Sequence, residues 1–175
     1  FIMIPVVFGI GAACINMIGV HFGAGQIDRA HRIGWTGAIA AGILTGGIGL
    51  FFAVFPEILA NAFTDNQGAR EAAQLYLRIV APFYGFFGLG LCLYFASQGT
   101  GRVAWAAFGN VARFIFVMIG GWLLYRYDNV SAQNLYWLVA IGMVIYGAIL
   151  IASVWLGAWR RGLPSEMQTD TVEQS

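Results

Sequence analysis

Five long runs of apolar residues make up most of this chain, and each is long enough to cross a lipid bilayer as one helix. A helix needs about 20 residues to span a hydrocarbon core of about 30 Å. Transmembrane strands are disfavoured because they alternate polar and apolar residues over about ten positions, whereas these runs stay apolar throughout. The sequence therefore predicts an all-α integral membrane protein with five transmembrane helices, over residues 1–22, 33–56, 75–98, 103–125 and 134–159.

Composition supports a membrane protein. Hydrophobic residues make up 59% of the chain and charged residues 10%, against about 25% charged residues in a soluble domain. A net charge of +1 provides no basic patch for nucleic acid, so we expect membrane lipid as a partner and no nucleic acid. Cys14 and Cys92 lie inside apolar runs and are interpreted as small buried residues, without a disulfide or a metal site.

Arginine placement predicts the orientation of the helices. Cytoplasmic loops carry the excess of basic residues. One side of the predicted bundle has five arginines and the other has two, with Arg78 near its edge. We therefore expect a multi-pass protein of a plasma membrane, such as the bacterial inner membrane, with a cytoplasmic C-terminus and a disordered polar tail over 162–175. The five arginines are Arg29, Arg32, Arg102, Arg160 and Arg161, and the two are Arg70 and Arg126.

The stretch HFGAGQIDRAHR, over residues 21–32, interrupts the first two apolar runs. Gly23 and Gly25 permit backbone angles closed to other residues, and Arg29 holds the loop inside. We expect a tight, structural cytoplasmic turn formed by Gly19, Gly23, Ala24, Gly25 and Arg29.

The second run carries small residues at helical spacing, which let helix backbones approach closely in lipid. They are Gly34, Ala38, Gly42, Gly46 and Gly49.

Arg113 is the charge placed deepest in the predicted helices, about 15 Å from the start of the fourth. Insertion scales assign such an arginine about 2.5–3.5 kcal/mol, and no Asp or Glu lies at comparable depth. Asn110, Ser97 and Gln98 are the local polar candidates to contact it. Two interpretations stay open: a polar substrate pathway, or a structural arginine that caps carbonyl groups.

The third run places aromatic and amide side chains along one helical face, which we call the aromatic stripe. Aromatic faces attract cations, so the stripe could line a cavity for lipophilic cations, although a lipid-facing or core stripe is more common. Pro82 and its neighbouring glycines weaken this helix, and a bend there would suit a rocking transporter. The stripe is Tyr76, Phe83, Phe87, Tyr94 and Gln98.

Motifs for catalysis are lacking. The sequence has no nucleotide-binding loop, no metal-ligand spacing and no nucleophile with a base. We therefore predict no enzyme activity, no metal site and no cofactor.

Three stretches together resemble the multidrug and toxic compound extrusion (MATE) family. GVHFGAGQIDRAHR resembles that family's Gly-x-x-x-Gly-Ala-x-x-x-x-Arg-Ala element, at Gly19, Gly23, Ala24, Arg29 and Ala30. FPEILANAFTDNQGAREAAQLYLRIVAP is similar to its outer connection, and ASQGTGR to the close of the following helix. The similarity extends to about Arg161.

The resemblance implies a two-lobe transporter of twelve helices with both termini cytoplasmic. Residues 1–161 would form five helices of the C-terminal lobe, numbers eight to twelve, in a fragment whose partner is the missing N-terminal lobe of the same chain. It also implies antiport, in which inward flow of Na⁺ or H⁺ drives export of small-molecule organic cations and drugs by alternating access.

One departure from the family bears on coupling. Some members carry a cation-binding aspartate where this chain reads Phe87-Gly88-Leu89, so we expect the coupling acids in the N-terminal lobe. Two alternatives are a lipid or polysaccharide flippase of the same superfamily, in which Arg113 would meet an anionic headgroup, and a non-transporting membrane subunit.

Overall fold

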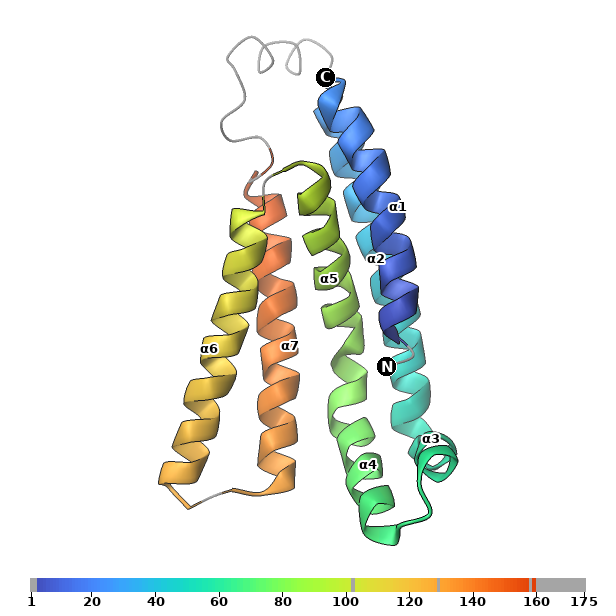
Figure 1. The fold of residues 1–175 in the computed structure, drawn as a ribbon, viewed down its shortest axis with the longest axis vertical. Helices are drawn as coiled ribbons and strands as arrows, with labels where there is room; N and C mark the ends of the chain where they lie inside the picture. Colours follow the sequence, from blue (N-terminus) through green and yellow to red (C-terminus); the bar gives the residue numbers. More distant parts are fainter. Residues whose placement is uncertain (1–2, 102, 129, 158, 160–175) are drawn as a thin grey trace.

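The computed structural model describes residues 3–101, 103–128, 130–157 and 159 as a bundle of helices, and it has no strand among them. The chain turns back at each end of the bundle, so its long helices run alternately up and down (Figure 1). The elements are α1 (Met3–Gly23), α2 (Ile27–Val54), α3 (Pro56–Phe63), α4 (Gln67–Val80), the 3-10 turn η1 (Ala81–Phe83), α5 (Tyr84–Gly99), α6 (Ala104–Arg126) and α7 (Ala132–Trp155).

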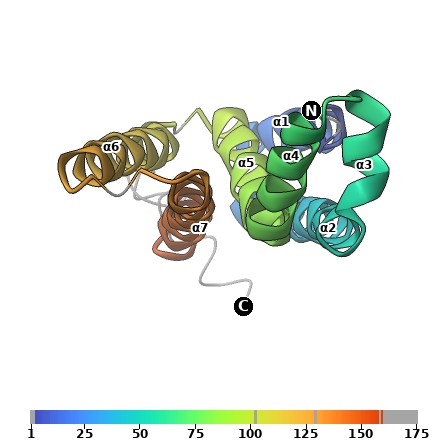
Figure 2. The same ribbon diagram turned by 90° about the horizontal axis from the view of Figure 1, so that it is seen from below.

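Helix α5 lies at the centre of the bundle. It packs against α1 and α2 on one side and against α7 on the other. Figure 2 shows α6 at the outer edge, with α7 as its neighbour, while α4 continues the line of α5. The α1–α2 turn is at one end of the bundle and the short helix α3 is at the other (Figure 1).

Four helical segments are long and apolar enough to cross a membrane, and α1 contributes a shorter apolar helix over Val7–Gly23. The segment Gln67–Gly99, formed by α4, η1 and α5, has 33 residues. At 1.5 Å per residue it measures about 50 Å, so its polar beginning extends beyond a bilayer core of about 30 Å. The predicted all-helical membrane bundle is confirmed. The other three long segments are Ile27–Val54, Ala104–Arg126 and Ala132–Trp155.

Small residues allow α2 and α5 to pack closely. A Cβ added to Gly46 would lie 3.3 Å from the Cα of Gly85, and one added to Gly42 would lie 3.2 Å from Leu89. Gly49 is buried against the backbone of Ala81, where a Cβ would overlap the carbonyl oxygen. The small residues of the second apolar run therefore bring helix backbones together, as their spacing indicates.

The α1–α2 turn is shorter than the sequence suggested. Helix α2 begins at Ile27 rather than near residue 33, so only Ala24–Gln26 lie between the helices. Gly25 has φ +76°, whereas Gly23 belongs to α1 and needs no special backbone angle. Gly19 lies inside α1 and Arg29 inside α2, so these two residues flank the turn.

The last predicted helix also ends earlier than expected. Helix α7 stops at Trp155, and the Trp159 side chain is buried in the core. Its Nε1–H donates a hydrogen bond to Ser97 Oγ at 3.2 Å. The predicted tail, 162–175, lies outside the described residues.

The two cysteines are buried and free. Their sulfur atoms, in α1 and α5, are 3.8 Å apart. They act as small core residues between the two helices, as their apolar surroundings suggested.

Candidate functional site

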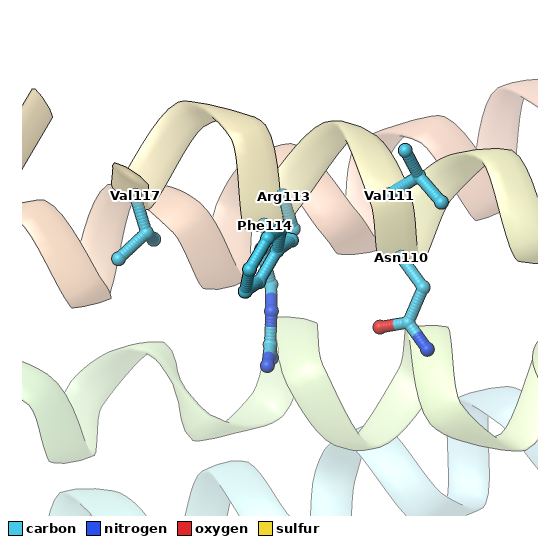
Figure 3. Close-up of a pocket in the computed structure, with 5 residues that line it drawn as sticks. All are labelled: Asn110, Val111, Arg113, Phe114 and Val117. Atoms are coloured by element: carbon cyan, nitrogen blue, oxygen red, sulfur yellow. The ribbon is translucent and has the colours of Figure 1, made fainter. Parts of the chain in front are cut away.

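Arg113 belongs to the middle of α6, a helix that packs almost entirely against α7. Only Ala106 and Gly109 of α6 are buried, and large apolar side chains such as Phe114 and Trp122 are exposed on it. Arg113 is half-buried, because its side chain leaves the helix on the side that faces the rest of the bundle (Figure 3).

The guanidinium of Arg113 lies against two aromatic rings from two other helices. Its Cζ atom is 5.5 Å from the ring centroid of Phe87 in α5 and 5.7 Å from that of Tyr146 in α7. The two rings are themselves 5.8 Å apart. Cation–π contacts within about 6 Å stabilise a cation by about 2 kcal/mol when water is excluded. The pair of rings therefore offsets part of the cost of placing this charge in the bundle.

Arg113 has no acidic partner in the part of the chain that the structure describes. The ion pair found there joins Arg70 and Asp65, 3.8 Å apart. Of the polar candidates near Arg113, Ser97 instead accepts a hydrogen bond from Trp159 and donates one to the Leu93 carbonyl. Gln98 is exposed at the end of α5.

A groove of about 370 Å³ lies beside Arg113, and we call it the Arg113 groove. Figure 3 shows the side chains of Asn110 and Arg113 leaving α6 on the same side, so an amide and a guanidinium are presented together. On α7, Gly142 lies next to the arginine stem, since a Cβ there would lie 3.5 Å from Arg113 Cγ. The groove is lined by Asn110, Val111, Arg113, Phe114 and Val117.

The aromatic stripe faces α7 and is largely occupied by packing. Tyr76 packs edge-to-face on Tyr136 with ring centroids 5.3 Å apart, and Phe83 does so on Trp137 at 6.2 Å. Tyr94 contacts Phe95. The stripe therefore does not line one continuous cavity.

Of the predicted site residues, Phe87 contacts the Arg113 guanidinium without lining the groove, and Asn110 lines the groove together with Arg113. Tyr76, Phe83, Tyr94 and Gln98 do not line the Arg113 groove. Sequence reasoning missed Tyr146, whose ring is 1% exposed. The sequence signal that could have found it is a polar phenol group in the middle of the most apolar of the four long helical segments, Ala132–Trp155.

At the α1–α2 turn the contacts are structural. Gln26 N–H donates to the His21 carbonyl at 2.8 Å, and the Arg29 guanidinium donates to Gln26 Oε1 at 3.4 Å. These bonds close the three-residue connection between the two helices.

Among the described residues, no group of three His, Cys, Asp or Glu side chains is placed to hold a metal ion.

Two curated relatives share part of this sequence. The multidrug and toxin extrusion protein 2 of Mus musculus is 29% identical over 100 residues, which cover 57% of this chain and 17% of that protein. The Golgi apparatus membrane protein tvp38 of Neosartorya fischeri is 33% identical over 104 residues, which cover 59% of this chain and 22% of that protein. The chain thus spans about a fifth of the length of these relatives.

No solved structure matches the chain significantly. The model of the MatE family matches residues 1–123, well over half of the sequence. This long match agrees with the order of the three stretches that resemble the family. The chain therefore belongs to the MatE family.

Proposed function

We propose that the whole protein is a secondary transporter that exports organic cations, driven by inward flow of Na⁺ or H⁺. The observation that carries the proposal is the pair of cation–π contacts that the Arg113 guanidinium makes with the rings of Phe87 and Tyr146. This pair of rings holds a cation where three helices meet inside the bundle. Family membership and the name of the mouse relative support the same function.

The aromatic pair suits a site that a substrate could enter. An organic cation that reached the Arg113 groove would compete with the guanidinium for the two rings, and the flexible arginine stem would let it move aside. Substrate entry and arginine displacement would then be coupled. This exchange gives Arg113 a part in gating the path.

An interruption of the helix lies close to Phe87 in the chain. The 3-10 turn over Ala81–Phe83, which contains Pro82, separates α4 from α5. Such an interruption lets a helix bend when two lobes rock against each other. We assign the bending needed for alternating access to this turn.

The coupling ion requires acids from elsewhere in the protein. The described carboxylates, Asp28, Glu57, Asp65, Glu71 and Asp128, all lie in loops or near helix ends. Because none lies near Phe87, we place the coupling site in the N-terminal lobe. Neutralising any one of the acids of this bundle should then leave gradient-driven export nearly unchanged.

The full-length protein in proteoliposomes tests the proposal. A Na⁺ or pH gradient should drive transport of tetraphenylphosphonium. Phe87→Leu should reduce that transport several-fold, whereas Tyr146→Phe, which keeps the ring, should retain it. Phe108→Leu, an exposed position on α6, is the matched control. Absence of gradient-driven cation transport in folded protein that is inserted in one orientation would contradict the proposal.

A flippase is the second candidate, because Arg113 and Asn110 present hydrogen-bond donors side by side in the Arg113 groove. An anionic headgroup would be the natural ligand for a guanidinium and an amide. The same proteoliposomes with a fluorescent phosphatidylglycerol distinguish the two. Flipping of this lipid without cation transport favours the flippase, and the absence of both activities favours a non-transporting subunit.

A further inference from the structure

A second groove, which we call the α1–α2 groove, lies between the first two helices near their turn. Its volume of about 660 Å³ is within the range of about 300–1,000 Å³ found for ligand sites. It is larger than the Arg113 groove and lies on different helices. Its lining comprises Ile10, Ala13, Cys14, Met17 and His21 of α1, and Arg29, Arg32, Ile33, Thr36 and Gly37 of α2.

The α1–α2 groove is apolar along one part and basic at its end. Ile10, Ala13 and Met17 give α1 an apolar wall. Arg29 and Arg32 stand near the start of α2, beside the turn, and both are exposed. Ile10 and His21 are separated by about 16 Å along the helix axis, so the apolar wall runs well into the membrane while the charged end stays at its edge.

Charge in this groove is of one sign. Among the described residues that line it, none is an Asp or Glu. Asp28 adjoins Arg29 in sequence but does not contribute to the lining. His21 adds a ring whose Nδ1–H donates to the Met17 carbonyl at 2.8 Å. Two guanidinium groups therefore stand at the mouth with no acid of the groove opposite them.

We propose that the α1–α2 groove binds an anionic phospholipid of the leaflet at the turn end of the bundle. The phosphate would lie between Arg29 and Arg32, which suit phosphate because the guanidinium presents a planar set of donors. One acyl chain would follow Met17, Ala13 and Ile10. Basic pockets between transmembrane helices select anionic headgroups in this way. A zwitterionic headgroup would bring its own cation next to the arginines and bind more weakly.

This site is separate from the proposed transport function. It is formed by α1 and α2, whereas the Arg113 groove belongs to α6, with its contacts on α5 and α7. Lipid binding can therefore succeed or fail whatever the protein transports.

Native mass spectrometry of the full-length protein in detergent tests the assignment. Dioleoylphosphatidylglycerol should bind more tightly than dioleoylphosphatidylcholine. The double variant R29Q/R32Q should weaken phosphatidylglycerol binding roughly 30-fold, which corresponds to about 1 kcal/mol for each arginine. R126Q, at an exposed arginine on the far end of α6, should leave binding unchanged.

A second variant keeps both arginines and fills the apolar part. Ala13 is exposed in the groove, so A13F should displace the acyl chain and weaken phosphatidylglycerol binding while the charges stay. This variant decides the matter if the double variant does not fold.

Three results would overturn the proposal. One is equal binding of the two lipids with no effect of R29Q/R32Q or A13F. Another is competition by inorganic phosphate at the same concentration as the lipid, which would indicate a site for a free anion. The third is a cross-link between Ala13→Cys residues of two copies in a parent that lacks other cysteines, which would assign the groove to a protein interface.

Discussion

Arg113 shows how the charge of one side chain can be accommodated in an apolar bundle without an acidic partner among the described residues. Insertion of an arginine at the centre of a helix costs about 2.5–3.5 kcal/mol. Two ring contacts, at 5.5 Å and 5.7 Å, offset part of this cost. The sequence suggested a polar partner for Arg113, but its guanidinium lies over the rings of Phe87 and Tyr146, which stand on helices that only tertiary packing brings together.

Replacing Arg113 tests whether the charge serves transport. In the full-length protein, Arg113→Leu should leave insertion unchanged or improved, because the cost of the charge is removed, while cation export falls at least roughly tenfold. Arg113→Lys should restore export in part, since an ammonium keeps the charge but loses the planar donor fork. Export in proteoliposomes and the yield of membrane-inserted protein are the two measurements.

Arg126→Leu is the matched control, since Arg126 is exposed at the end of the same helix and outside the Arg113 groove. Normal export by Arg113→Leu would exclude the functional role. Loss of folded protein would instead identify Arg113 as a structural arginine.

At the scale of helices, the close contact between α2 and α5 depends on glycines, which have no side chain to hold the two backbones apart. Gly49→Ala should destabilise the bundle by about 1–3 kcal/mol, because its Cβ would overlap the carbonyl oxygen of Ala81. Gly47→Ala on the same helix meets nothing within 4 Å, and it should be neutral or slightly stabilising. Thermal unfolding of the two variants in detergent compares them. Equal melting temperatures would show that α5 can shift away from α2 without loss.

The start of α4 gives a second test on a single element. The Asn66 side chain caps this helix by accepting a hydrogen bond from Ala69 N–H at 3.1 Å. Asn66→Ala should lower stability by about 1 kcal/mol. Asp65→Ala should have a smaller effect, because the Asp65 carboxylate is exposed and its 3.8 Å pairing with Arg70 is screened by water. A larger loss of melting temperature in Asp65→Ala than in Asn66→Ala would contradict the cap assignment.

For the whole molecule, the orientation in the membrane remains a prediction from arginine placement. The α1–α2 turn and the connection before α4 lie at opposite ends of the bundle (Figure 1). Single cysteines at Ala24 and Gln67, in a full-length parent that lacks Cys14 and Cys92, should therefore react with an impermeant thiol reagent from opposite sides. Ala24 is preferable to Gly25, whose φ of +76° would strain a cysteine. Labelling of both positions from one side would contradict the five-helix topology.

The fold class could be predicted from the sequence because lipid leaves few choices. Backbone groups in hydrocarbon must be satisfied within the segment, so apolar runs of about 20 residues become helices. Helix ends were less certain, because the cues at a boundary are weak: Asp28 and Arg29 resemble a loop but continue α2. The close α2–α5 packing followed from small residues in register, although the partner helix could not be named.

The sequence by itself determined that this chain is a bundle of membrane helices, that Arg113 is deep within one of them, and that Gly25 stands in a turn. Tertiary structure alone decided what surrounds these residues. Phe87, Arg113 and Tyr146 meet because α5, α6 and α7 pack around one point, and Trp159 reaches Ser97 across 62 positions of the chain. Periodicity defines which face of a helix is apolar, but in a bundle where nearly every face is apolar it cannot define which neighbour that face meets.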